Sequence, residues 1–262
     1  MPYTNNGIHY ECNGHGDPLV LLNGIMMSTV SWSYHVERLK NDFNVITFDF
    51  KDQGKSSRED KDYHIFDRSN DLLDLMKYLK IESAHIVGVS YGAHVAEYFA
   101  AKFPSKVKGL VLSNATFKVK NHLREIGKSW EYSANTYDPE LLFRVSFPFI
   151  YSRTFYDSNP EWIEKRIKIS SSSTTKEWMD GFIRLSKSSR DFDLSKEIRQ
   201  IKSPTLVISA SEDLLIPSNE MKEMSFLIEN SKFLKVKNTG HAFFLERPEL
   251  FCKIIKKFLK SV

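Results

Sequence analysis

The sequence predicts a doubly wound α/β fold, with a mostly parallel sheet and an inserted helical cap. Three observations lead to this prediction. Short continuous runs of Val, Ile and Leu recur along the chain, segments with helical spacing separate many of them, and one long segment without a convincing strand interrupts the alternation. Continuous apolar runs are typical of parallel strands that are buried on both faces, and their alternation with helices is typical of the α/β class.

The strands are predicted where apolar runs are bounded by turn residues. An early strand contains Cys12, and the later ones cover 18–22, 44–48, 84–88, 107–112, 204–209 and 232–236. A helix is predicted over 67–79, because Leu72, Leu75, Met76 and Leu79 recur at helical spacing.

The alternation stops between residues 116 and 200, which are rich in aromatic residues such as Trp130, Phe147 and Trp178. An excursion of this length between two strands is too long for a plain loop. We therefore expect residues 1–115 and 201–262 to form the core of the fold and 116–200 to form a helical cap. Most of the aromatic side chains are expected to pack within the cap, and a minority to line a pocket.

Composition limits the classes of function. The chain has 262 residues, which is enough for one domain with a substantial core. No apolar stretch approaches the roughly 20 residues that span a bilayer, and no signal peptide is evident. Cys12 and Cys252 lie far apart in the sequence, in no metal-binding pattern. We expect a cytoplasmic protein without a membrane span, a metal ion or another cofactor. Its oligomeric state stays open.

The net charge of +4 does not point to nucleic acid. The densest group of lysines lies near the C-terminus, at positions 253, 256, 257 and 260. Spacings of three and four place these lysines on the solvent face of a helix, opposite Ile255 and Phe258. No nucleic-acid-binding motif accompanies them, so no nucleic-acid partner is expected.

The sequence Gly88-Val89-Ser90-Tyr91-Gly92 has the pattern G-x-S-x-G, between an apolar run and a helix-competent segment. A strand, a tight turn and a helix in this order are the context of a nucleophile elbow. The outer glycines suit a turn that brings strand and helix backbones very close together. Ser90 is therefore the candidate nucleophile.

A serine hydroxyl needs a base, usually histidine, and an acid that orients the base. Glu212 and Asp213 follow the run at 204–209, and His241 follows the run at 232–236. Either acid is possible from position alone. His85, within a predicted strand, and His94, on the helix after the elbow, are expected to have packing or surface roles.

These motifs resemble those of the α/β-hydrolase fold superfamily, and the resemblance extends from about residue 8 to residue 260. The segment 21–24 resembles a strand-ending His-Gly motif, although Asn23 replaces the histidine. The segment 48–56 resembles the turn D-x-R-G-x-G-x-S, although Asp52-Gln53 replaces Arg-Gly. Pro248 and Phe251 resemble the start of the last helix. We expect Asn23 to alter the floor of the pocket and interpret the second change as structural only.

The resemblance favours Asp213 over Glu212 as the acid. It also implies that the backbone N–H groups of Ile25 and Tyr91 form an oxyanion hole. The implied activity is that of a serine hydrolase, which cleaves a carboxylic ester, lactone or thioester of a small molecule without a cofactor. Met26 and Met27 either line the acyl pocket or fill the core.

Two other functions stay open. An acyltransferase would pass the same acyl group to an acceptor other than water, and a slow-turnover receptor would use the same fold to bind a ligand. Haloalkane dehalogenases and epoxide hydrolases are disfavoured, because they carry aspartate where this chain has Ser90.

Overall fold

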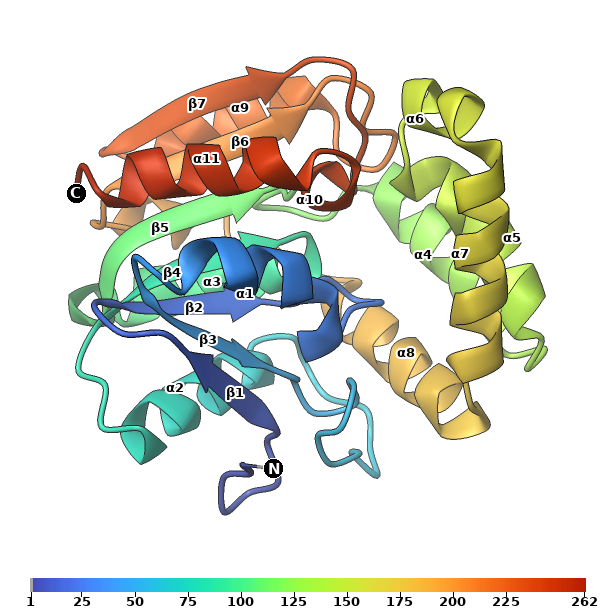
Figure 1. The fold of residues 1–262 in the computed structure, drawn as a ribbon, viewed down its shortest axis with the longest axis horizontal. Coiled ribbons are helices and arrows are strands. Elements are labelled where there is room, and N and C mark those ends of the chain that lie inside the picture. Colours follow the sequence, from blue (N-terminus) through green and yellow to red (C-terminus); the bar gives the residue numbers. More distant parts are fainter. Residues whose placement is uncertain (1) are drawn as a thin grey trace.

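A computed structural model describes residues 2–262; Met1, where the predicted core begins, lies outside the described residues. Seven strands form one sheet in the order β1-β3-β2-β4-β5-β6-β7 (Figure 1), and only β1 runs antiparallel to its neighbour. The predicted α/β fold is confirmed, and the predicted strand ends differ by no more than one residue. The strands are β1 (Tyr10–Asn13), β2 (Pro18–Leu22), β3 (Asn44–Phe48), β4 (Ala84–Val89), β5 (Val107–Ser113), β6 (Thr205–Ala210) and β7 (Ser231–Val236).

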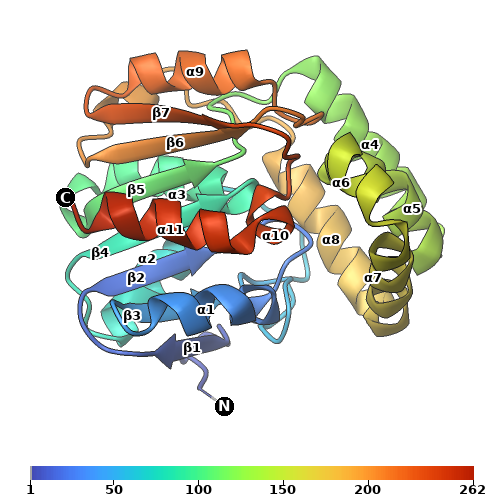
Figure 2. The same ribbon diagram turned by 45° about the horizontal axis from the view of Figure 1, so that its top comes forward.

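Helices cover both faces of the sheet, with α1 and α11 on one face and α2, α3 and α9 on the other (Figure 2). Among residues 2–262, no helix is both long and apolar enough to cross a bilayer. These helices are α1 (Ser33–Leu39), α2 (Asp67–Tyr78), α3 (Tyr91–Lys102), α9 (Ser218–Leu227), α10 (Phe243–Glu246) and α11 (Pro248–Leu259), with 3-10 turns at Thr29–Trp32, Pro104–Lys106 and Ile198–Gln200.

Two helices follow their predicted patterns closely. The predicted helix 67–79 corresponds to α2, and α11 buries Ile255 and Phe258 while Lys253 and Lys257 remain exposed. The other two lysines of this group, Lys256 and Lys260, form ion pairs with Asp42 at the surface.

The central strand β4 shows why the apolar runs are continuous. All six of its residues are buried. Successive side chains of a strand point to opposite faces, so Ile86 packs against the α2, α3 and α9 layer while Val87 packs against the α1 and α11 layer. The parallel strands β4, β6 and β7 end at the same edge of the sheet, and the segments that follow them therefore lie close together.

Five helices separate β5 from β6 in the sequence and lie together beside this edge (Figures 1 and 2). We call them the helical insert: α4 (Asn121–Ala134), α5 (Pro139–Ile150), α6 (Arg153–Ser158), α7 (Pro160–Ser173) and α8 (Lys176–Ser189). Local sequence defines where they begin. Pro139 occupies the first turn of α5, and the Asp138 side chain accepts the Leu141 N–H at 3.0 Å. The division into core and cap at residues 116 and 200 stays a prediction.

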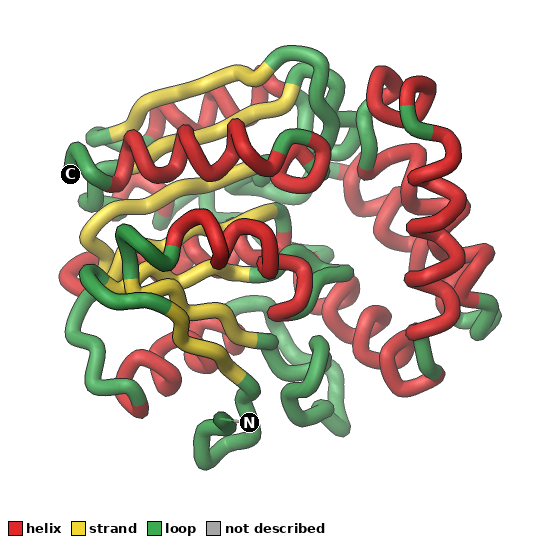
Figure 3. Tube along the Cα trace, viewed as in Figure 1, coloured by secondary structure: helices red, strands yellow, loops and turns green. Residues whose placement is uncertain are grey.

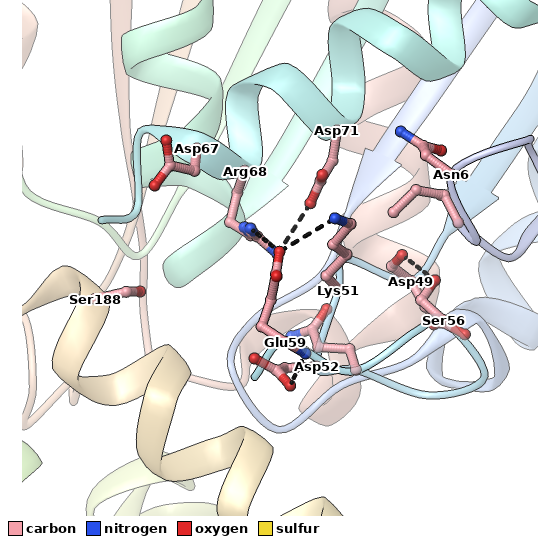
Figure 4. Close-up of polar contacts among 12 residues, drawn as sticks. Asn6, Asp49, Lys51, Asp52, Ser56, Glu59, Asp67, Arg68, Asp71 and Ser188 are labelled. Atoms are coloured by element: carbon pink, nitrogen blue, oxygen red, sulfur yellow. Dashed lines mark hydrogen bonds and ion pairs between the residues drawn. The ribbon is translucent and has the colours of Figure 1, made fainter. Parts of the chain in front are cut away.

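The segment between β3 and α2 is a loop (Figure 3). A cluster of buried and partly buried charges holds it in place. The carboxylate of Glu59 pairs with Arg68 at 3.0 Å and with Lys51 at 3.2 Å (Figure 4). Arg68 also pairs with Asp71 at 3.2 Å. Burial nevertheless raises the pKa of Asp71 to about 6. This cluster orders the loop that carries Asp52 and Gln53.

Asp52 connects this loop to the helical insert. Its buried carboxylate accepts two hydrogen bonds from the Arg184 guanidinium on α8, at 2.6 and 3.0 Å. It also accepts the backbone N–H of Glu59 at 3.1 Å. Two parallel bonds from a guanidinium fix orientation as well as distance. The pair therefore joins α8 to the core beside the strand ends.

Replacing Arg184 with methionine would leave the buried Asp52 carboxylate without its counter-ion. We expect the free energy of unfolding, measured by urea titration, to fall by about 3 kcal/mol. The matched control is Arg153→Met, which removes the exposed pair with Asp157 on α6 and should cost less than about 0.5 kcal/mol. The double variant Asp52→Asn/Arg184→Met should recover part of the loss. Equal stability of the two single variants would contradict this account.

Candidate active site

Ser90 lies on a sharp turn between β4 and α3. Its backbone has φ 54° and ψ −118°, a conformation that L-residues rarely adopt. The flanking glycines are required by contact distances. A Cβ on Gly88 would lie 2.5 Å from the Cα of Ala93, and one on Gly92 would lie 2.5 Å from the carbonyl oxygen of Leu22. The backbone thus places the Ser90 hydroxyl at the start of α3.

The structure brings Ser90, His241 and Asp213 into one chain of hydrogen bonds. The Oγ of Ser90 lies 2.8 Å from Nε2 of His241, and Nδ1 of His241 lies 2.9 Å from Oδ2 of Asp213. The side chain of Asp213 is fully buried and that of His241 is 9% exposed. A serine, a base and an orienting acid in this geometry are the parts that nucleophilic catalysis requires.

Asp213, and not Glu212, contacts His241. The Oδ1 atom of Asp213 accepts the backbone N–H groups of Leu215 and Ile216, and Oδ2 also accepts a hydrogen bond from the Asn114 side chain at 2.8 Å. Glu212 instead accepts two hydrogen bonds from Thr154 on α6. The choice of Asp213 from family resemblance therefore agrees with the geometry, and sequence reasoning missed Asn114.

The oxyanion hole that the family resemblance implies would consist of the backbone N–H groups of Ile25 and Tyr91. The N–H of Tyr91 is at the first residue of α3, where no intrahelical acceptor exists. Within residues 2–262, neither this group nor the N–H of Ile25 donates to another backbone carbonyl. Both residues line cavities that Ser90 also lines. The two groups are available to a developing negative charge.

Two buried amide side chains hold the loop that carries Ile25. Gln53 Nε2 donates to the carbonyl of Gly24 at 2.9 Å and to that of Ile25 at 3.3 Å. Asn23 Nδ2 donates to Gln53 Oε1 at 3.2 Å, and Asn23 Oδ1 accepts the Trp32 indole N–H at 2.8 Å. The amides therefore fix the position from which the Ile25 N–H points.

Two interpretations from sequence need correction at this point. Asn23 is fully buried and does not line either cavity beside Ser90, so it does not form the floor of the pocket. Its side-chain amide instead bonds to Gln53 and Trp32. The change at Gln53 also affects the site, because its amide bonds to the carbonyl of Gly24, which lines a cavity beside Ser90. The departure from the family turn was visible in the sequence, but its contact with a segment about 30 residues away was not.

Two small cavities meet at Ser90 and His241. The first has a volume of about 100 Å³ and the second about 80 Å³. Ile25, Trp130 and Leu215 line both cavities. The first is mostly apolar, and Met26 and Met27 both belong to its wall. Met27 also accepts the Gly24 N–H at its sulfur, at 3.1 Å, so it supports the loop as well.

More charged residues line the second cavity than the first. The wall of the second includes His94 and the ion pair between the buried Glu131 on α4 and the partly exposed Arg190 at the end of α8. Burial lowers the pKa of His94 to about 3, so its imidazole is neutral at physiological pH. Its ring stacks on Phe192, with centroids 4.5 Å apart. His94 thus has the packing role expected from sequence and is also part of the cavity wall.

His85 also lies where the sequence placed it, within β4, where it is buried. Among residues 2–262, no group of three or more His, Cys, Asp or Glu side chains is arranged to hold a metal ion.

Comparisons with known proteins agree with this fold. A family model described as alpha/beta hydrolase fold matches residues 17–248. The structure is similar to that of MGS-M2, an alpha/beta hydrolase enzyme from a Medee basin deep-sea metagenome library, with a TM-score of 0.94 and 36% identity over 99% of this chain and 96% of that chain. The chain therefore belongs to the alpha/beta hydrolase fold family, as its motifs predicted.

Two named enzymes are among the similar proteins. The enol-lactonase from Burkholderia xenovorans LB400 has a TM-score of 0.89 and 25% identity, over 99% of this chain and all of that chain. The pyrrolizixenacetamide deacetylase of Xenorhabdus hominickii is 26% identical over 262 residues, which covers 97% of this chain and 95% of the relative.

The amide of Gln53 can be tested by hydrogen exchange, without any substrate. Gln53→Leu would leave the carbonyls of Gly24 and Ile25 without their buried donor. The free energy of local opening should then decrease, and the backbone amides of residues 23–28 should exchange with solvent at least about tenfold faster. Gln200→Leu, at an exposed position, is the control and should leave this segment unchanged. Unchanged exchange in Gln53→Leu would contradict the assigned role.

The buried His94 predicts a pH dependence of stability. Its pKa is lowered on folding, so the unfolded state binds more protons below pH 6.5, and stability falls as pH decreases from 6.5 towards 3. Between pH 6.5 and 5 this contribution is about 2 kcal/mol. In urea titrations, the free energy of unfolding of the wild type should therefore fall by about 2 kcal/mol more over this interval than that of His94→Phe. His122→Phe, at an exposed position, should follow the wild type. A His94→Phe profile parallel to the wild type would overturn the prediction.

Proposed function

We propose that the protein is a serine hydrolase that cleaves a carboxylic ester, lactone or thioester through an acyl-enzyme on Ser90. The observation that carries this proposal is the hydrogen-bonded chain from Ser90 through His241 to Asp213. The second support is the pair of N–H groups, from Ile25 and Tyr91, beside the serine. The deacetylase and lactonase among the similar proteins act on acyl groups by name, which agrees with this class of reaction.

In the first half of the reaction, the Ser90 oxygen attacks the acyl carbon while its proton moves to Nε2 of His241. Asp213 accepts the Nδ1–H of His241 and stabilises the imidazolium. The N–H groups of Ile25 and Tyr91 stabilise the oxyanion, and each such donor is worth about 3 kcal/mol. His241 then gives its proton to the leaving alcohol or thiol, and the acyl group stays on Ser90.

In the second half, His241 removes a proton from a water molecule, which attacks the acyl carbon. Collapse of the second oxyanion intermediate releases the carboxylic acid, and the Ser90 oxygen takes its proton back from His241. All groups in this cycle are supplied by the chain itself.

The cavities favour a small substrate. A dry cavity of about 150 Å³ accommodates a molecule of the size of benzene. The two cavities beside Ser90 are smaller, at about 100 and 80 Å³. The preferred acyl and leaving groups are therefore short, and kcat/KM should fall as the acyl chain lengthens.

Ser90→Ala should lower kcat for 4-nitrophenyl acetate by about 10⁴-fold or more, because no other group forms the acyl-enzyme. A fluorophosphonate probe should label the wild type and fail to label this variant. Ser172→Ala, on the exposed part of α7, is the matched control and should keep both activity and labelling. Turnover by Ser90→Ala at the wild-type rate would refute the proposed function.

A further inference from the structure

Arg166 is the cation in the wall of the first cavity. It lies on α7, and most of the other residues that line this cavity are apolar. Tyr151 lines the same cavity, and the positive charge of Arg166 partly offsets the rise that burial causes in the pKa of the Tyr151 hydroxyl. Arg166 is partly buried and contributes to the cavity wall.

No carboxylate of residues 2–262 forms an ion pair with Arg166. The neighbouring helix α5 offers a contrast, because its Arg144 pairs with both Glu140 and Glu164. A charge in a mostly apolar environment is costly unless a counter-ion is present. The cavity therefore has a cation whose charge no acidic side chain neutralises.

Two hydroxyl groups add donors beside this cation. Burial raises the pKa of Tyr151 to about 12, so its O–H remains protonated at neutral pH. Ser170 lies one helical turn after Arg166 on α7 and lines the same cavity. A guanidinium forms two parallel hydrogen bonds with a carboxylate, and hydroxyl donors can occupy its remaining lone pairs. This set of groups matches a carboxylate on a ligand.

We propose that Arg166 selects ester substrates that carry a carboxylate on the part that occupies the first cavity. The inference rests on the proposed function, because the first cavity is also lined by Ser90 and His241. The small volume of the cavity requires a short spacer between the ester and the carboxylate. The carboxylate belongs either to the acyl group or to the alcohol of the ester, and an experiment can distinguish these two locations.

Two pairs of nearly isosteric esters test the proposal. Monomethyl succinate carries a carboxylate on the acyl side, where methyl 4-oxopentanoate has a neutral methyl ketone. Acetoxyacetate carries it on the alcohol side, where acetoxyacetone has the same neutral group. Hydrolysis is followed by acid release at constant pH. We expect kcat/KM of the wild type to be about tenfold or more higher for the anionic member of one pair, as for a hydrogen bond to a charged group.

Arg166→Met should abolish this preference, measured as the ratio of kcat/KM for the anionic and neutral members of a pair, and Arg166→Lys should restore part of it. Lys165→Met, an exposed neighbour on the same helix, removes the same net charge and should leave the preference intact. This control separates a local contact from attraction by the overall charge of +4.

Equal kcat/KM for the anionic and neutral members of both pairs would overturn the inference, and so would a preference that Arg166→Met retains. Either result leaves the proposed function standing, since the neutral esters are still hydrolysed. If the wild type hydrolysed none of the four esters and did not hydrolyse 4-nitrophenyl acetate either, the proposed function would be refuted. Thermal unfolding of Arg166→Met near the wild-type temperature excludes loss of folding as the cause.

Discussion

The close backbone contact at the Ser90 turn is the constraint on which the rest of the site depends. Gly88 and Gly92 have no room for a Cβ, and Ser90 adopts a positive φ between them. Such a conformation costs about 1–3 kcal/mol and persists only where surrounding contacts over-determine it. Here the Ser90 N–H donates to the carbonyl of Ser113 on β5, and its own carbonyl accepts N–H groups of α3. The strained turn is thus anchored to both the sheet and the helix.

A second set of buried polar contacts places the oxyanion loop against this turn. Asp49 accepts the backbone N–H groups of Thr29 and Lys55, and Asn23 and Gln53 connect it to the carbonyl groups beside Ile25. The adjacent Asp52 extends the connection to α8. One loop after β3 therefore holds the segment that carries Ile25, the proposed oxyanion donor, and joins the helical insert to the core. Buried amides and carboxylates suit this role, because each unsatisfied group would be costly.

Sequence alone predicted the parts of the fold that short-range patterns determine. Apolar runs identified the strands, and the order of Ser90, Asp213 and His241 at strand ends identified the groups that the structure brings together. It did not predict the roles of Gln53 or Arg166. Both roles depend on which distant segment of the chain the side chain contacts, and short-range sequence patterns do not reveal such contacts. The helical insert was the least readable segment, since its apolar residues serve packing and cavity walls alike.

The central claim is that an acyl group is carried on Ser90 during turnover. Its most direct test is to quench the wild-type protein in acid during steady-state hydrolysis of a short ester and to map the peptides by mass spectrometry. The account predicts an acyl adduct on the peptide that contains Ser90, which disappears once the substrate is exhausted. An adduct on another residue, or turnover without any adduct on Ser90 when acyl-enzyme breakdown is slowed at low pH, would contradict it.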